Sequence, residues 1–140
     1  MREELIATDF VLDTFAYLAY LNDESGAATV EQILASAAHG TSRGWMTVIN
    51  VGEVLYVTER RRGPNGARAA VALLDRLGIR VVDAGRQLTF AAAHIKAALA
   101  LSYADAFAAA LARRLGAVLI TGDPEFRAVE SLIRVRWLET

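Results

Sequence analysis

Short apolar runs that favour β-strands alternate with longer helical patterns along the whole chain. The run "AVLITGD" is typical of these strands, because its apolar and β-branched residues end at a Gly–Asp turn signal. Strands separated by helices pair in parallel, through right-handed crossovers that carry the helices over the faces of the sheet. The sequence therefore predicts an α/β fold, a three-layer α/β/α sandwich around a mostly parallel sheet.

The predicted elements follow one another in a regular order. Strands are expected over residues 9–14, 44–49, 79–83, 117–123 and 134–139. Helices are expected over residues 15–22, 24–40, 50–63, 65–78, 86–101, 102–116 and 123–130. No internal repeat or low-complexity linker interrupts this order, so we expect a single domain over residues 1–140.

The composition is that of a compact domain without disulfides. Apolar residues make up 54% of the 140 residues, and there is no cysteine. The longest apolar stretch, residues 88–112, is interrupted by His94, Lys96 and Asp105, and the "MREEL" start lacks the features of a signal peptide. We therefore expect a soluble, cytoplasmic protein with no membrane span. The net charge of −1 gives no overall attraction to nucleic acid, so any contact with nucleic acid has to come from local basic patches.

Four acidic residues stand at the boundaries of predicted elements. Asp13 and Asp123 end two strands, whereas Glu53 and Asp105 lie in the first turns of two helices. Their helical neighbours are mostly apolar, and only Asp123 has a basic residue, Arg127, three or four positions away. A buried carboxylate without a partner is energetically costly, so each acid needs hydrogen bonds or a cation.

Helix capping is the local explanation for each acid. A carboxylate at a helix start accepts hydrogen bonds from the exposed backbone N–H groups there. The sequence offers two capping boxes, one N-cap followed by proline, and one N-cap after the first strand: Ser102–Asp105, Asn50–Glu53, Asp123–Pro124 and Asp13–Thr14. Capping and metal binding are compatible, since a capping carboxylate keeps lone pairs for a cation.

A divalent cation shared by the four acids would explain all of them together. The carboxyl ends of parallel strands meet at one edge of a sheet, so the four acids are expected to converge there. Their mutual repulsion would be relieved by Mg²⁺ or Mn²⁺, which bind carboxylate oxygens. Such a site suits hydrolysis of a phosphodiester, with Glu53 or Asp123 orienting the attacking water. Polar side chains that could support the acids are Thr14, Asn50, Ser102 and Thr121.

Four short motifs occur in order along the chain: "VLDT" (11–14), "NVGEVL" (50–55), "YADAF" (103–107) and "TGDPEF" (121–126). Together they resemble the motifs of PIN-domain nucleases, most of all those of VapC-type toxins from bacterial and archaeal toxin–antitoxin pairs. The resemblance implies a PIN-like fold and Mg²⁺- or Mn²⁺-dependent endoribonuclease activity on RNA. It also implies inhibition by a cognate antitoxin, and a surface that contacts this antitoxin or a second copy in a homodimer.

The resemblance also implies roles for individual residues. The acids that match the family's catalytic and metal-binding positions are Asp13, Glu53, Asp105 and Asp123. The first and third of these match the direct metal ligands. Thr121 matches a family hydroxyl two residues before the fourth acid, and Glu125 lies where some members carry a further acid.

Two segments have more than one interpretation. The basic segment "ERRRGPNGAR" (59–68) fits favourable charge at the end of a helix, or a contact with phosphates. The apolar helix within residues 15–25 fits the core, an antitoxin-binding groove or a homodimer contact.

Three other functions share parts of this acidic pattern. A receiver-like signalling module also gathers acids at strand ends, but it requires a lysine at a late strand end, and Lys96 lies in a helical pattern. A phosphohydrolase with an aspartyl nucleophile favours a second Asp at position 15, which is Phe. The third is a catalytically silent PIN-like binding protein, and the presence of all four acids argues against it.

Overall fold

A five-stranded, all-parallel sheet forms the centre of the computed structural model, which describes residues 8–139. The strand order is β3-β2-β1-β4-β5, so the first strand of the chain lies in the middle. The strands are β1 (Thr8–Leu12), β2 (Ser42–Thr47), β3 (Arg80–Val82), β4 (Val118–Thr121) and β5 (Val135–Trp137). The predicted parallel sheet is confirmed; the "MREEL" start lies outside the described residues.

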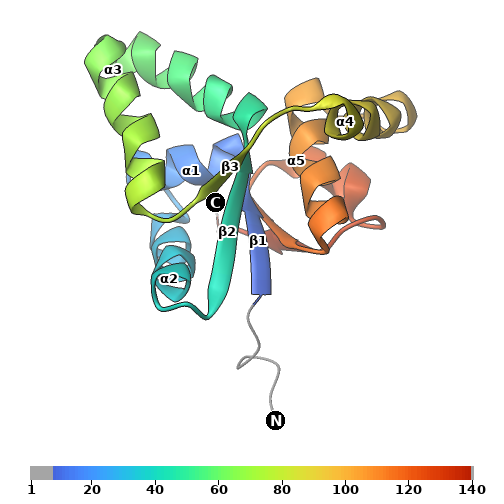
Figure 1. Cartoon of the computed structure of the whole chain (residues 1–140), viewed down its shortest axis with the longest axis horizontal. Coiled ribbons are helices and arrows are strands. Elements are labelled where there is room, and N and C mark those ends of the chain that lie inside the picture. Colours follow the sequence, from blue (N-terminus) through green and yellow to red (C-terminus); the bar gives the residue numbers. More distant parts are fainter. Residues whose placement is uncertain (1–7, 140) are drawn as a thin grey trace.

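Helices cover both faces of the sheet (Figure 1). One layer holds α1 (Thr14–Leu21), α2 (Ala27–Ala38) and α3 (Val48–Arg76). The other holds α4 (Arg86–Ala98), α5 (Tyr103–Leu115) and the short 3₁₀ helix η2 (Pro124–Val129). The predicted three-layer α/β/α sandwich is therefore confirmed.

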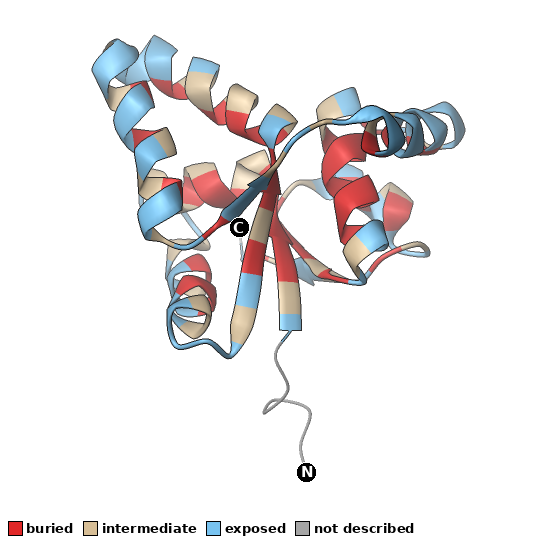
Figure 2. Ribbon diagram, in the orientation of Figure 1, coloured by how far each residue is buried: buried red, intermediate tan, exposed pale blue. Residues whose placement is uncertain are grey.

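Both faces of the central strands are buried, which explains why these strands are continuously apolar in sequence. Val11 and Leu119 pack against α4 and α5, whereas Leu12 and Ile120 pack against the layer of α1 to α3. Figure 2 shows the buried residues on the inner faces of the helices and along the central strands. Helix α1 belongs to this core, since Tyr17 is fully buried and its hydroxyl donates to the carbonyl oxygen of Ala70 at 2.6 Å.

Helix α3 joins the two helices predicted at 50–63 and 65–78 through a sharp bend. Gly63 adopts φ 79° and ψ 174°, a left-handed backbone conformation that glycine reaches at little cost. Pro64 follows it and starts the second arm, because proline is tolerated in the first turn of a helix. The first arm begins at Val48, so the strand predicted over 44–49 is wrong at its last two residues.

No single helix within residues 8–139 has the length and apolar character needed to cross a membrane. Helices α4 and α5 have that length and apolar character only when they are taken together, and the two helices meet at a bend of 116°.

Candidate metal centre

The carboxyl ends of β1 and β4 lie side by side, and this places two of the predicted acids at one edge of the sheet. Leu12 pairs with Ile120 in the parallel ladder, so Asp13 follows one strand beside Thr121 at the end of the other. Asp123 comes two residues later and starts η2. The sheet register therefore brings together two acids that are 110 residues apart in the chain.

Asp13 lies at the bottom of this site with only 1% of its surface exposed. One carboxylate oxygen accepts the Ala16 N–H at 2.7 Å and so caps α1, and the other accepts the Thr121 hydroxyl. The pKa of Asp13 is raised to about 7, chiefly by burial and in smaller part by the charges of Asp123 and Glu53. The two hydrogen bonds lower this pKa, but by less than burial raises it. Asp13 is therefore shielded from water, and neither of its two hydrogen-bond donors carries a positive charge.

Asp105 reaches the same site from the first turn of α5. It is 8% exposed, and its backbone N–H donates to the hydroxyl of Ser102, the N-cap of the helix, at 3.1 Å. The pKa of Asp105 is raised to about 8, chiefly by burial and in smaller part by contact with Glu125 and by the charges of Asp123 and Asp13. The opposing effect of the Ser102 hydrogen bond is smaller than that of burial.

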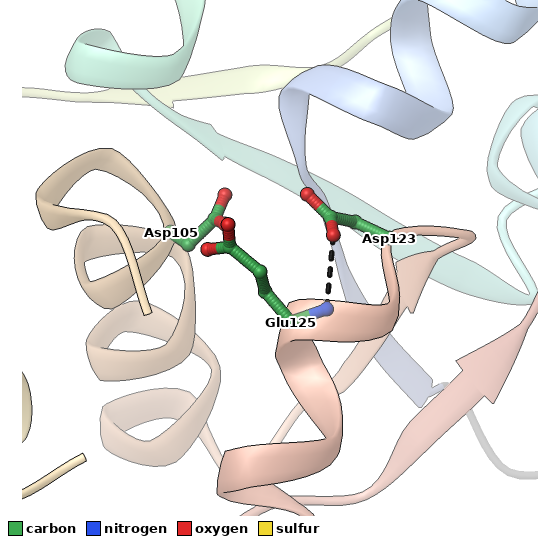
Figure 3. Close-up of side chains that lie close together, drawn as sticks. All are labelled: Asp105, Asp123 and Glu125. Atoms are coloured by element: carbon green, nitrogen blue, oxygen red, sulfur yellow. Dashed lines mark hydrogen bonds between the residues drawn. The ribbon is translucent and has the colours of Figure 1, made fainter. Parts of the chain in front are cut away.

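Three carboxylates converge in this site: Asp105, Asp123 and Glu125. One oxygen of each lies within 4.8 Å of an oxygen of the other two, and Figure 3 shows the side chains gathered between α5 and the start of η2. Asp123 also caps η2 by accepting the Glu125 N–H at 2.9 Å. Carboxylate oxygens are the ligands that hard divalent cations such as Mg²⁺ and Mn²⁺ prefer, so acids at this separation could hold one.

Glu53 and Asn50 line the α3 side of the site. The Thr14 hydroxyl donates to Glu53 at 2.6 Å, and the Asn50 amide donates to Thr14 at 3.2 Å and to the carbonyl oxygen of Ala104 at 3.3 Å. Asn50 therefore links the starts of α1, α3 and α5 around the acids. Glu53 lies outside the group of three carboxylates but close enough for its charge to raise the pKa of Asp13.

No basic side chain within residues 8–139 forms an ion pair with these acids. The ion pair between Arg43 and Asp9, at 2.8 Å, lies near the opposite ends of the strands. Buried acids with raised pKa values and no basic partner fit a cation held by oxygen ligands.

A family model for the PIN domain matches residues 10–132 of the chain. The chain belongs to the PIN-domain family. The match includes all five acids of the site, so the acidic edge of the sheet is part of the PIN domain itself.

Solved structures share this PIN fold at low sequence identity. A chain of VapBC2 from Rickettsia felis, solved with a promoter DNA fragment, aligns at 16% identity and TM-score 0.72, over 94% of this chain and 100% of that one. VapC20 from Mycobacterium tuberculosis, a toxin that cleaves the sarcin–ricin loop, aligns at 21% identity and TM-score 0.68, over 86% and 94%. A chain of FitAcB from Neisseria gonorrhoeae aligns at 18% identity and TM-score 0.65, over 90% and 95%. No curated protein matches the sequence.

The predicted N-caps Asp13 and Asp123 are confirmed, and Ser102 is the N-cap of α5 as predicted. The Ser102–Asp105 capping box is wrong in its second half, because the Ser102 N–H donates to Glu125 and not to Asp105. The Asn50–Glu53 capping box is wrong, because α3 begins two residues earlier and its N-cap is Thr47, whose hydroxyl accepts the Asn50 N–H at 3.1 Å.

Two contributors to the PIN-domain site are absent from the sequence prediction. Thr47 also donates its hydroxyl to the Asn50 side chain at 2.6 Å, and it orients the amide that links α3 to α5. The carbonyl oxygen of Ala104 is the second contributor. A threonine directly after an apolar strand is a recognisable N-cap signal, whereas a backbone carbonyl leaves no trace in the sequence.

Proposed function

We propose that this PIN-domain protein is a Mg²⁺- or Mn²⁺-dependent endoribonuclease that acts as the toxin of a toxin–antitoxin pair. The observation that supports the proposal most directly is the convergence of Asp105, Asp123 and Glu125 beside the buried Asp13. Family membership favours this activity over the receiver-like alternative.

In this proposal the metal is held by Asp13, Asp105 and Asp123, with Glu53 at the α3 side of the site. A cation held there would supply positive charge to balance the phosphate oxygens of RNA and would make water more acidic. Asp13 and Asp123 keep lone pairs for it, because each carboxylate oxygen has more acceptor sites than its capping bond uses. Thr14, Asn50, Ser102 and Thr121 hold the acids in place through the hydrogen bonds described above.

Glu53 is suited to orienting the attacking water. It is partly exposed, and a single hydroxyl, that of Thr14, holds one of its oxygens. The second oxygen is free within the described hydrogen-bond network to accept a proton from water, as a general base does.

The basic segment 59–68 surrounds the bend of α3 and supports an RNA contact. Arg60 packs its guanidinium over the exposed ring of Tyr56 at 5.1 Å, and Tyr56 lies three residues after Glu53. Arginine and an exposed aromatic ring are the side chains that proteins use to hold single-stranded RNA. Arg62 instead donates to Asn22 at 2.7 Å, a bond that fixes the bend to the end of α1.

The proposal includes a cognate antitoxin, a homodimer and a cytoplasmic location, where the RNA substrate is found. Solved structures of the same fold include the VapBC2 complex of R. felis and a toxin–antitoxin complex from Klebsiella pneumoniae. Exposed apolar side chains available for protein contacts are Val48, Tyr56, Val81, Phe90 and Tyr103. Co-expression with a small protein encoded next to this chain tests the antitoxin, and light scattering tests the dimer.

RNA cleavage by the Asp105→Asn variant tests the nuclease. The substitution removes a carboxylate charge at nearly constant volume, so we expect a folded protein without cleavage activity and without growth inhibition. Asp75→Asn is a matched control, because Asp75 is exposed near the end of α3. Wild-type activity should disappear in EDTA and return with Mn²⁺. Unaltered cleavage by Asp105→Asn would overturn the site, and a wild-type protein inactive with every metal would indicate a silent binding module.

A further inference from the structure

The N-terminus of α5 is capped partly from outside the helix. Ser102 accepts the Asp105 N–H through its hydroxyl, as an N-cap serine does. The backbone N–H of Ser102 itself donates to Glu125 at 2.9 Å, and Glu125 lies 23 residues further along the chain, in η2. This bond connects α5 to the segment that carries Asp123.

In a capping box, the backbone N–H of the N-cap residue, here Ser102, donates a hydrogen bond to a side chain of the same helix. The residue three positions after the N-cap supplies that acceptor, and here this residue is Asp105. Had Asp105 bent back to Ser102, its carboxylate would be occupied at the helix start. Instead, its carboxylate lies among those of Asp123 and Glu125 (Figure 3).

We propose that Glu125 is a positioning residue that takes the capping bond of α5 in place of Asp105, and so leaves the Asp105 carboxylate to face the metal. The proposal rests on the proposed function, since it assigns Asp105 to the metal. It separates the roles of two neighbouring acids: Asp105 binds the cation, and Glu125 holds the helix that presents it.

The backbone of Glu125 is anchored beside α5, and its exposed side chain reaches Ser102 from there. Its backbone N–H donates to Asp123 at 2.9 Å, and the next residue, Phe126, is fully buried in the core against α5. Pro124 fixes the first turn of η2. One hydrogen-bonded chain therefore runs from Asp123 through Glu125 to Ser102 and on to Asp105, and it sets the position of both proposed ligands.

Two substitutions separate capping from metal ligation. Glu125→Gln keeps a side-chain oxygen that can accept the Ser102 N–H but lacks the negative charge of a ligand. Glu125→Ala removes the acceptor. Glu31→Ala, at an exposed position on α2, is the control for the loss of a surface glutamate. The readouts are Mn²⁺ affinity by calorimetry and hydrogen exchange of the Ser102 amide by NMR in metal-free protein.

We expect Glu125→Ala to weaken Mn²⁺ binding about 10- to 100-fold, as the loss of a residue that orients a ligand does. The Ser102 amide should then exchange faster, because its acceptor is gone. Glu125→Gln should retain most of the Mn²⁺ affinity and the slow exchange. Equal losses of affinity in both variants would overturn the proposal and make Glu125 a direct ligand. Unchanged exchange in Glu125→Ala would also overturn it.

These readouts distinguish the positioning role from the proposed function. Exchange at Ser102 reports on the capping bond in the absence of metal and RNA. If the wild-type protein binds no Mn²⁺, the proposed function fails even where the exchange result supports the capping bond. If the wild-type protein binds Mn²⁺ and Glu125→Ala binds it equally well, the positioning role fails and the proposed function stands.

Discussion

The Thr14 hydroxyl donates to the Glu53 carboxylate at 2.6 Å, and it thereby joins the first residue of α1 to the first arm of α3. Asn50 supports the same hydroxyl with an amide hydrogen bond at 3.2 Å. Thr14 directly follows Asp13, so one short turn holds a buried acid and orients a second acid on another helix. This arrangement makes Thr14 the residue that sets the side-chain direction of Glu53.

Thr14→Val removes that hydroxyl at nearly constant volume. We expect the RNA cleavage rate to fall about 10- to 100-fold, a loss typical when a partner that orients a metal-site carboxylate is removed. The measurement is single-turnover cleavage at saturating Mn²⁺. Thr14→Ser is the control and should keep most of the rate, because it retains the hydroxyl. Equal rates for all three proteins would show that Glu53 needs no support from Thr14.

The stability of the metal-free protein should depend on the ionisation of Asp13 and Asp105. Their pKa values are raised in the folded state to about 7 and about 8, from 3.8. Folding therefore favours their neutral forms, and the stability they contribute is complete below pH 4. It declines as the pH rises above 4, and it is fully lost once the pH has passed the folded-state pKa values of about 7 and about 8. We expect this loss in urea unfolding measured in EDTA.

Comparison with Asp105→Asn isolates one of these groups. Asparagine does not ionise, so the variant should gain stability relative to the wild type between pH 4 and pH 9, and its melting temperature in EDTA at pH 9 should be the higher of the two. Parallel pH profiles for the two proteins would mean that Asp105 titrates in the fold as it does in the unfolded chain.

The alternation of strand-like and helical runs was sufficient to predict the layers and the parallel sheet, because both depend on local periodicity. Element ends were less accurate. Thr47 and Asn50 are both plausible caps in sequence, and the choice between them depends on a long-range pairing. Thr47 pairs with Val82 in the ladder between β2 and β3, so the strand ends there and α3 begins at the next residue.

The candidate site was predictable only as far as its residues follow from local sequence patterns. Acids at strand ends and helix starts are visible in the sequence, and the sheet brings Asp13 and Asp123 to one edge. The partners of these acids are not visible. Thr14 and Glu53 are 39 residues apart, and Ser102 and Glu125 are 23 apart, so no helical or strand spacing relates them.

Metal should stabilise the folded protein only when the site is intact. We expect Mn²⁺ to raise the melting temperature of the wild type, by the equivalent of about 2.7 kcal/mol at 100 times its dissociation constant. Asp13→Asn should show little or no rise, since it lacks the buried charge of the proposed ligand. Differential scanning calorimetry with and without Mn²⁺ checks this, with Asp75→Asn as the control that should respond like the wild type.

Tyr17→Phe tests the bond that fixes α1 to the second arm of α3. The Tyr17 ring is fully buried and its hydroxyl donates to Ala70 at 2.6 Å, so we expect a loss of about 1–2 kcal/mol in urea unfolding. Tyr20 stacks on Tyr17 with ring centroids 6.2 Å apart, and no hydrogen bond of its hydroxyl occurs within residues 8–139. Tyr20→Phe should therefore be near neutral. A larger loss for Tyr20→Phe than for Tyr17→Phe would contradict this account.

Gly122→Ala tests how closely α1 packs on the loop that carries Asp123. A Cβ atom at Gly122 would lie 2.8 Å from Cζ of Phe15, so either the ring or the end of β4 has to move. We expect a loss of about 1–3 kcal/mol in the free energy of unfolding, the usual range for overpacking. Movement of β4 would also displace Thr121 from Asp13 and weaken Mn²⁺ binding.

The matched control is Gly52→Ala, in the first arm of α3. A Cβ atom at Gly52 meets no atom within 4 Å among the described residues, and alanine favours a helix over glycine by about 1 kcal/mol. Gly52→Ala should therefore stabilise the protein where Gly122→Ala destabilises it. If calorimetry gives both variants the stability of the wild type, Phe15 yields without cost, and the position of Asp123 does not depend on its packing against α1.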